Sequence, residues 1–461
     1  MKSQQIDFGT ESVTVLFRKM FIPTVLGMLS LSAVTMIDGI FVGHGVGSDG
    51  IAAVNICIPL LMVMQGIGMM AGAGCSVLAS ISLSHGKRHE ARAHVTNAML
   101  FVTILALAVL LVIYLAPERV AYMLGSSQHL LPMVLDYLLW FAPSLLFQVW
   151  LSVALLVIRL DGAPRLAMWC SIIDAVVNAV LDWLFIFPLG MGIQGAALAT
   201  SICCLIGAVI AVVYLLFYAR DVRMHALCGD TRGVMFFLHD MAEQAKIGFS
   251  AFLGEATLSV IFFVGNHVFM HYLGDDGVGA FGISCYYMPF AFMIGNAIAQ
   301  SAQPIISYNF GLGDDKRVHL ALTTAVRTAL CCGLIPMACF MFLPKPLVML
   351  FLSLDTPAAH MAVYGFPYYG LAFIFMVLNL TIIGYYQSIE RVRPSVMFAM
   401  LRGVVFLVPC FLLLPEVLGT RGIWLALPLS ECLTTCVIMM VMLWHSRHHH
   451  TLATQTLPIK R

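Results

Sequence analysis

Three polar side chains recur at every fourth position of one strongly apolar stretch of this chain. They are Asp174, Asn178 and Asp182. Four residues advance an α-helix by about 40° and about 6 Å, so the three side chains would form one stripe on a helix. A carboxylate at the centre of a bilayer costs about 2.5–3.5 kcal/mol on insertion scales. Two on one helix face are hard to explain as packing residues, and they indicate a site for a proton or a cation.

The rest of the chain has the composition of a membrane protein. Of its 461 residues, 61% are hydrophobic and 10% are charged, and the mean hydropathy is +0.95. Apolar runs repeatedly exceed the roughly 20 residues that cross a bilayer core as a helix. They are too long and too apolar for barrel strands, so we expect helical spans in a lipid bilayer. The sequence has no basic tract or recognition motif that would indicate nucleic acid as a partner.

Hydropathy predicts an all-α membrane protein with twelve transmembrane helices. The predicted spans are 13–43, 51–83, 95–115, 130–157, 164–188, 193–218, 245–272, 278–308, 318–343, 359–388, 394–415 and 419–444. Most loop Lys and Arg residues follow the even-numbered spans, whereas the opposite loops hold only Arg119, Lys345 and Arg421. The positive-inside rule therefore predicts a multi-pass protein of the cytoplasmic (inner) membrane with both termini in the cytoplasm.

The chain also repeats itself. GSDGIAAVNICIP at 47–59 resembles GDDGVGAFGISCYYMP at 274–289, and RLDGAPR at 159–165 parallels IERVRP at 389–394. The offset of about 228 residues indicates a duplication. We therefore predict two six-helix lobes, residues 1–225 and 226–461, related by a pseudo-two-fold axis along the membrane normal, as in transporters with parallel repeats. The charged stretch 219–243 is predicted to be the cytoplasmic linker between them.

Polar residues that differ between the two halves are the candidates for function. Asp38, Asn178 and Asp182 have no acidic or amide counterpart at the aligned positions, and Thr200 aligns with Leu427. Asp38, Asp182 and Thr200 each lie about six to eight residues from the outer end of a span, which is about 9–12 Å below the surface. They could form a proton-sharing carboxyl pair or an oxygen cage for sodium. Alternatively, each polar group bonds its own backbone or a neighbouring helix.

Four further residues, Pro23, Asp174, Glu255 and Glu431, have roles that the sequence leaves open. Pro23 in the first span removes a backbone hydrogen bond and lets the helix bend, either as a passive kink or in response to protonation of Asp38. Asp174 lies nearer mid-span, where it could simply line a cavity instead of binding the ion. The second half carries Glu255 in its first span and Glu431 in its last.

The cysteines, Cys203 and Cys204 among them, lie mostly within apolar runs and are expected to be free buried thiols rather than disulfides or zinc ligands.

The chain resembles the multidrug and toxic compound extrusion (MATE) family of secondary transporters over nearly its whole length. Four motifs carry the resemblance: IDGIFVGHGVGSDGIAAVNICIP, NAVLDWLFIFPLGMGIQGAALAT, AQSAQPIISYNFGLGD and MLRGVVFLVPCFLLLPEVLGTRGIWLALPLSE. Similarity to the prokaryotic DinF-type branch implies that a proton or sodium ion binds in the first lobe. The matching positions are Asp38, Asn178, Asp182 and Thr200, with Pro23 as the bending point of the first helix.

Other members of the family use acidic residues of the second lobe. Glu255 matches the glutamate of that group, but the tenth span, FPYYGLAFIFMVLNLTIIGYYQ, lacks the aspartate that partners it. Asn379 is the nearest polar candidate. This departure from the family pattern favours the ion site of the first lobe.

Together these features predict a monomeric antiporter, not an enzyme, that exports amphipathic or cationic compounds in exchange for H⁺ or Na⁺. It would need no cofactor, and no metal other than Na⁺. A flippase for lipid-linked precursors, from the same superfamily, is the main alternative; it would need a strongly cationic cavity, and only Arg402 and Arg327 lie within the spans. An intramembrane enzyme is a third possibility, but the sequence shows no paired nucleophile and base and no metal triad.

Overall fold

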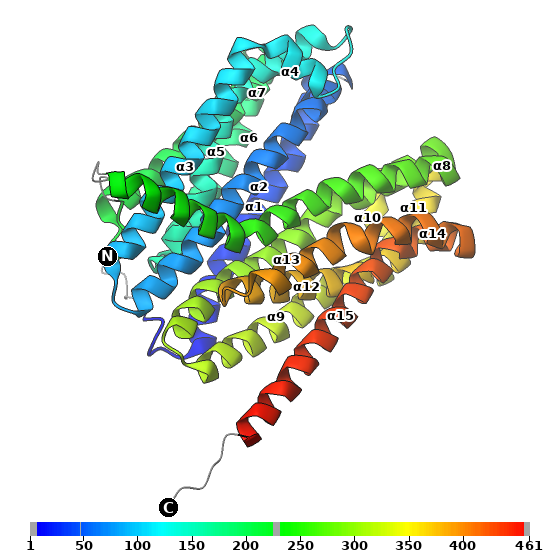
Figure 1. Ribbon diagram of the computed structural model, residues 1–461. Coiled ribbons are helices and arrows are strands. Elements are labelled where there is room, and N and C mark those ends of the chain that lie inside the picture. The colour runs from blue at the N-terminus through cyan, green and yellow to red at the C-terminus, as the bar shows by residue number, and fades with distance from the viewer. Residues whose placement is uncertain (1–6, 47, 225–230, 456–461) are drawn as a thin grey trace, which may run out of the picture.

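The computed structural model describes residues 7–46, 48–224 and 231–455, and every regular element in these ranges is a helix (Figure 1). In chain order the helices are α1 (Val13–Gly45), α2 (Ser48–Ser84), α3 (Arg88–Leu115), α4 (Pro117–Met123), α5 (Leu131–Leu160), α6 (Pro164–Ile186), α7 (Gly192–Val213), the π-helix η1 (Tyr214–Tyr218), α8 (Thr231–Gly311), α9 (Asp315–Phe342), α10 (Pro344–Met349), α11 (Pro357–Tyr369), α12 (Ala372–Ser388), α13 (Val392–Met400), the π-helix η2 (Leu401–Val405), α14 (Leu407–Leu418) and α15 (Thr420–Gln455).

These helices supply the predicted number of membrane spans. Eleven are long and apolar enough to cross a bilayer, and α11 and α12 form a twelfth that is bent by 49°. Helix α8 contains two spans, 237–274 and 276–311, which meet at Gly274. Its φ of 65° lies in a region that glycine adopts without steric cost. The prediction of an all-α bundle with twelve spans is confirmed.

The predicted linker between the halves was too long. Helix α8 begins at Thr231 and its membrane span at Phe237, so much of the stretch 219–243 is helical. The apolar run 234–238 lies within this helix, whereas Arg220, Asp221 and Arg223 lie before it in a segment without regular structure. The predicted lobe boundary at 225/226 lies outside the described residues.

Each half of the chain builds a lobe with its own buried core. In the first lobe α2, α3, α5 and α7 enclose apolar side chains such as Val102 and Leu138. In the second, α8, α11, α12 and α15 enclose an aromatic cluster that includes Phe281 and Trp424. The two bundles meet at one end and diverge toward α4 in the first lobe and α11 and α14 in the second (Figure 1). The two-lobe fold is therefore as predicted.

Helix α1 packs against both lobes. Near its start, Leu16 and Met20 belong to a buried cluster with Ile305 of α8 in the second lobe. Near its other end, Val42 packs on Ile186 of α6 in the first lobe. Pro23 interrupts the helical hydrogen bonding between these two regions. A bend at this proline would therefore change how the lobes are connected.

Polar contacts join the lobes at the end where they meet. Arg159 of α5 donates to Gln300 of α8 over 2.7 Å. Asp240 of α8 lies 2.6 Å from Nδ1 of His94 and accepts a 2.7 Å hydrogen bond from Asn97, both on α3. The basic loops lie at this end of the spans, which the positive-inside rule assigns to the cytoplasm.

Two glycines let the lobes approach to backbone contact. A Cβ atom at Gly248 of α8 would lie 1.8 Å from the carbonyl oxygen of Met70 on α2. A Cβ atom at Gly74 of α2 would lie 2.0 Å from the carbonyl oxygen of Gln244 on α8. No side chain fits at either position unless the two helices separate, so this crossing requires glycine.

Replacing either glycine of the crossing should therefore destabilise the observed arrangement. We expect Gly74→Ala and Gly248→Ala to lower stability by about 1–3 kcal/mol, the usual cost of overpacking. Thermal unfolding of the detergent-solubilised protein measures the effect. Gly254→Ala is the matched control, because a Cβ there would meet nothing closer than the Phe292 ring at 4.0 Å. Equal melting temperatures for all three variants would contradict the close crossing.

Candidate ion site and central cavity

Two of the predicted acidic residues come together between α1 and α6. Asp38 of α1 and Asp182 of α6 are near enough for a hydrogen bond between their carboxyl groups. Asp182 is 0% exposed. Among the described residues, no N–H or O–H group donates to either oxygen of Asp182 or to Oδ1 of Asp38. The sequence expectation that these two acids share one site agrees with this geometry.

No basic side chain among the described residues is paired with either carboxyl group. Two ionised carboxyl groups in contact repel each other, and burial away from water makes the repulsion stronger. A proton between them, or a cation beside them, removes the repulsion and supplies the missing partner. The arrangement can therefore take up and release one positive charge.

The other two predicted members of this site, Asn178 and Thr200, differ in their surroundings. Asn178 is buried on the same face of α6, one turn from Asp182. The Thr200 hydroxyl of α7 donates to the carbonyl oxygen of Ala196 in its own helix over 3.1 Å. This is the backbone bond that the alternative interpretation anticipates, although the hydroxyl oxygen retains lone pairs that can face a cation.

The carboxyl pair has an aromatic neighbour that was not predicted from the sequence. Tyr137 of α5 is buried and lies close enough to Asp38 and Asp182 to interact with both charges. A tyrosine buried in lipid or protein normally finds a polar partner for its hydroxyl. Its place near the start of a span, at the same predicted depth as the acids, was the only signal in the sequence.

Asp174 lies in a different environment from Asp182. Its carboxyl group is 6% exposed and lies beside Cys203 and Cys204 of α7. It also lines a cavity between the lobes, as the mid-span position of Asp174 suggested. The polar stripe of α6 thus serves two separate places, the carboxyl pair and the cavity wall.

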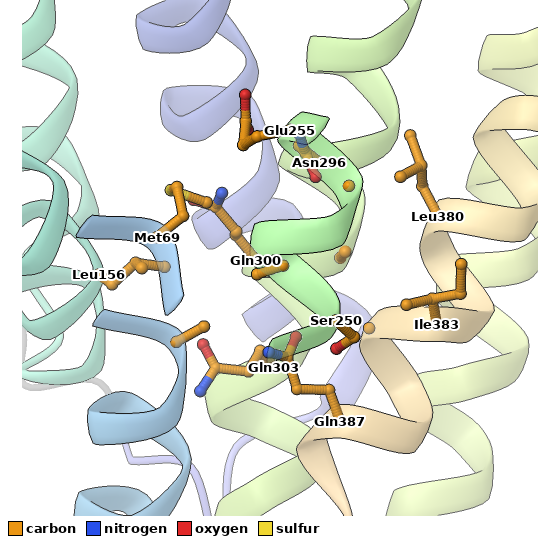
Figure 2. A pocket seen from close by; sticks show the side chains of 15 residues that line it. Met69, Leu156, Ser250, Glu255, Asn296, Gln300, Gln303, Leu380, Ile383 and Gln387 are labelled. Carbon is orange, nitrogen blue, oxygen red and sulfur yellow. The ribbon is translucent and has the colours of Figure 1, made fainter. Parts of the chain in front are cut away.

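The lobes enclose two adjoining cavities near the end where they meet. Glu255, Asn296 and Gln300 of α8 line both, opposite apolar residues of the first lobe such as Met69 and Leu156 (Figure 2). Asp174, Gln148 and Arg159 line one of the two. The lining combines methionine and leucine side chains with about as many polar and charged groups, a mixture that suits amphipathic ligands.

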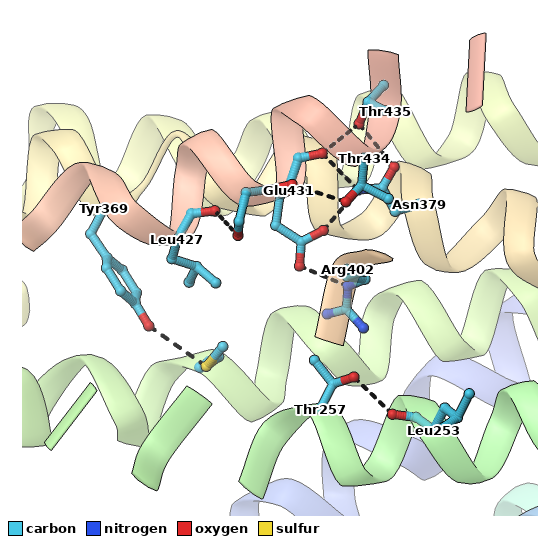
Figure 3. A network of polar contacts seen from close by, with 11 residues as sticks. Leu253, Thr257, Tyr369, Asn379, Arg402, Leu427, Glu431, Thr434 and Thr435 are labelled. Carbon is cyan, nitrogen blue, oxygen red and sulfur yellow. Dashed lines mark hydrogen bonds and ion pairs between the residues drawn. The ribbon is translucent and has the colours of Figure 1, made fainter. Parts of the chain in front are cut away.

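Glu255 and Asn379, the two candidates for a second-lobe site, have different surroundings. Glu255 faces the cavity, whereas Asn379 of α12 donates to Oε2 of Glu431 over 2.7 Å. Glu431 also accepts a 2.7 Å hydrogen bond from Arg402, and Asn379 accepts a 2.8 Å hydrogen bond from Thr435 (Figure 3). Asn379 therefore belongs to an internal ion-pair network of the second lobe.

Arg402 is positioned for this pairing by an irregular turn. It lies in η2, and π-turns of this kind often occur at functional or specially constrained positions. Its side chain is 1% exposed, and its guanidinium lies 5.8 Å from the centre of the Phe292 ring. The arginine thus pairs with an acid inside the second lobe.

Breaking this ion pair should cost far more than removing a surface pair. We expect Arg402→Met or Glu431→Gln alone to lower stability by about 3–5 kcal/mol, because the partner is left charged and buried. The double variant should recover much of the loss. Glu90→Gln, which breaks the exposed Lys87–Glu90 pair, is the control and should change stability by less than about 1 kcal/mol. Thermal unfolding in detergent measures all four; a double variant as unstable as the sum of the single ones would contradict the pairing.

The fold and the site define a class: a duplicated, helical, multi-pass membrane protein with a cavity between its lobes and a buried acidic pair in one of them. The sequence model of the MatE family matches residues 23–184 and 251–412, one stretch in each lobe. The chain therefore belongs to this family, and the resemblance identified from its motifs is confirmed.

Relatives and solved structures agree over nearly the full length. The chain is 24% identical to the multidrug export protein MepA of Staphylococcus saprophyticus over 446 residues, which is 96% of each chain. It is 24% identical to the FAD transporter of Shewanella oneidensis, covering 90% of this chain and 91% of the relative.

Two solved structures are similar in fold. An outward-facing multidrug resistance MATE transporter matches with a TM-score of 0.85 and 19% identity, covering 95% of this chain and 96% of the other. A MATE transporter in the straight conformation matches with a TM-score of 0.87 and 19% identity, covering 98% and 100%.

Proposed function

We propose that this protein exports amphipathic, often cationic compounds across the cytoplasmic membrane in exchange for H⁺ or Na⁺. The proposal rests on the carboxyl pair of Asp38 and Asp182, in which neither oxygen of Asp182 nor Oδ1 of Asp38 has a hydrogen-bond donor among the described residues. Membership of a transporter family supports it, as do relatives named multidrug export protein and FAD transporter. Both termini would lie in the cytoplasm, a monomer would suffice, and no cofactor beyond the coupling ion would be needed.

The position of the carboxyl pair, with Asp38 on α1 and Asp182 on α6, suggests how the ion would drive the transport cycle. Binding of a proton or Na⁺ would remove the repulsion between the two carboxylates across the α1–α6 contact and would favour the bent form of α1. Loss of the ion would favour the straight form. Because the start of α1 packs in the second lobe, a displacement that bends it near Pro23 would alter the inter-lobe contacts. An ion can drive such a change only by binding the two states with different affinity.

The charge of the cavity favours cationic compounds over phosphorylated lipids. Two carboxyl groups, from Asp174 and Glu255, line it, and its guanidinium, from Arg159, already donates to Gln300. Arg402 is paired with Glu431 inside the second lobe. A flippase for lipid pyrophosphates would require unpaired basic side chains facing the cavity, so that function ranks second. The relatives are named as transporters, so they give no support to an enzymatic function.

Removing either carboxyl group of the pair should uncouple transport. In proteoliposomes with an imposed pH or Na⁺ gradient, we expect Asp38→Asn and Asp182→Asn to reduce the export of a cationic dye to that of empty vesicles. The amide cannot take up and release a positive charge, which is what coupling requires. Imposing the two gradients one at a time distinguishes H⁺ from Na⁺ as the coupling ion.

The control for this experiment is Asp136→Asn, which removes an exposed carboxyl group from α5 of the same lobe. It should transport at the rate of the unmodified protein. Monodisperse elution of all three variants shows that they fold. Gradient-driven export that survives in both Asp38→Asn and Asp182→Asn would refute the proposed ion site.

Glu255 should determine the preference for positive charge. We expect Glu255→Gln to slow the export of a monovalent cationic dye by about tenfold, because losing about 1.4 kcal/mol of attraction changes binding by that factor. Export of a neutral compound of similar size should change little. Competition assays in the same proteoliposomes compare the two substrates. Equal slowing of both would mean that Glu255 has a structural or coupling role instead.

A further inference from the structure

We propose that Asp174, Cys203 and Cys204 form a binding site for a soft divalent cation, Zn²⁺ or Cd²⁺, beside the central cavity. Asp174 comes from α6 and the two cysteines from α7. One carboxylate oxygen and the two sulfur atoms all lie within 4.8 Å of one another. The site is separate from the Asp38–Asp182 pair, because Asp174 precedes Asp182 by eight residues, about 12 Å along α6.

One oxygen of the Asp174 carboxyl group, Oδ1, lacks the partner that its burial requires. Asp174 is 6% exposed, and among the described residues nothing donates a hydrogen bond to its Oδ1 atom. Buried polar atoms are normally satisfied, and an exception requires a proton, an ion or a water molecule. A cation shared with the neighbouring sulfur atoms would satisfy this oxygen.

The donor set matches soft and borderline metals. Thiolates bind Zn²⁺ at about 2.3 Å and carboxylates at about 2.0–2.2 Å, so in tetrahedral coordination neighbouring ligand atoms lie about 3.5–3.8 Å apart. The three ligand atoms, which lie within 4.8 Å of one another, would have to approach by up to about 1 Å to hold one ion in this geometry. Oε1 of Gln148 on α5 lies 3.5 Å from Sγ of Cys204 and could complete four-fold coordination. Binding would release the two thiol protons.

A disulfide between the two cysteines is not a competing explanation. Adjacent Cα atoms are about 3.8 Å apart across a trans peptide bond, whereas disulfides usually span about 4.4–6.8 Å. The neighbouring thiols are free of a disulfide, and metal binding would replace the hydrogen bonds that Cys203 donates to the carbonyl oxygen of Thr200 over 3.1 Å and Cys204 to Oε1 of Gln148 over 3.5 Å. Both are buried, which protects them from bulky reagents but not from a small ion that enters through the cavity.

The ion has a route to the site and room beside it. Asp174 and Gln148 both line the cavity between the lobes. Gly207 of α7 leaves space next to the carboxyl group, since even an added Cβ atom there would lie 3.6 Å from Oδ1 of Asp174. A bound metal would join α5, α6 and α7 on the cavity wall.

Cadmium binding to the purified, reduced full-length protein tests this site. The sulfur-to-cadmium charge-transfer absorption reports thiolate ligation, and titration against a competing chelator gives the number of tight sites. We expect the unmodified protein to bind one equivalent that Cys203→Ser and Cys204→Ser each lose. Asp174→Asn should keep part of the absorption but bind at least about tenfold more weakly, as expected when one ligand is removed.

Two matched controls exclude general thiol or carboxylate binding. Cys410→Ser removes a buried thiol of the second lobe, and Asp136→Asn removes a carboxyl group of the first lobe away from the cluster. Both should retain the tight equivalent, and all variants should elute as monodisperse protein. The proposal fails if the tight equivalent survives in Cys203→Ser and Cys204→Ser, if Cys410→Ser also loses it, or if Asp174→Asn binds as tightly as the unmodified protein. Because the assay measures binding alone, its result does not depend on whether the protein exports drugs.

Discussion

Two carboxyl groups in contact inside an apolar helix bundle repel each other unless a positive charge lies between or beside them. Asp38 and Asp182 meet in this way, and the described residues supply no donor to Asp182. The contact depends on α1 lying along α6, and α1 in turn packs at its start with the second lobe. The charge state of one side-chain pair and the relation of the two lobes are therefore linked through a single helix.

The sequence was sufficient for the architecture because the signals that define it are local. Long apolar runs, the asymmetry of basic loops and the internal repeat predicted twelve spans in two lobes, and the aligned differences pointed to Asp38 and Asp182. The linker at 219–243 was misjudged because its charged residues flank an apolar run that extends α8. The bend between α11 and α12 was not foreseen, since hydropathy does not distinguish a straight span from a broken one.

Depth along a helix could be counted from the sequence, but the direction of each side chain could not. Asp38, Asp182 and Thr200 were placed at one level, yet the Thr200 hydroxyl bonds its own backbone. Asn379 seemed a partner for Glu255, but it turns toward Glu431. Tyr137 and the cysteines beside Asp174 became relevant only once the packing of α5, α6 and α7 was known. Contacts between helices far apart in the chain decide such details.

The glycine crossing of α2 and α8 also has a mechanical consequence. Where two backbones touch, there is no layer of side chains that could deform. The two helices would therefore move relative to each other mainly by rotation, with the contact as the pivot point. From Gly248 to the turn at Gly274, α8 extends for about 39 Å at 1.5 Å per residue. A swing of about 10° would thus displace its far tip by about 7 Å, with only small shifts near the contact. A small rotation at the contact between α2 and α8 would thus increase the separation of the two lobes at the end where they diverge.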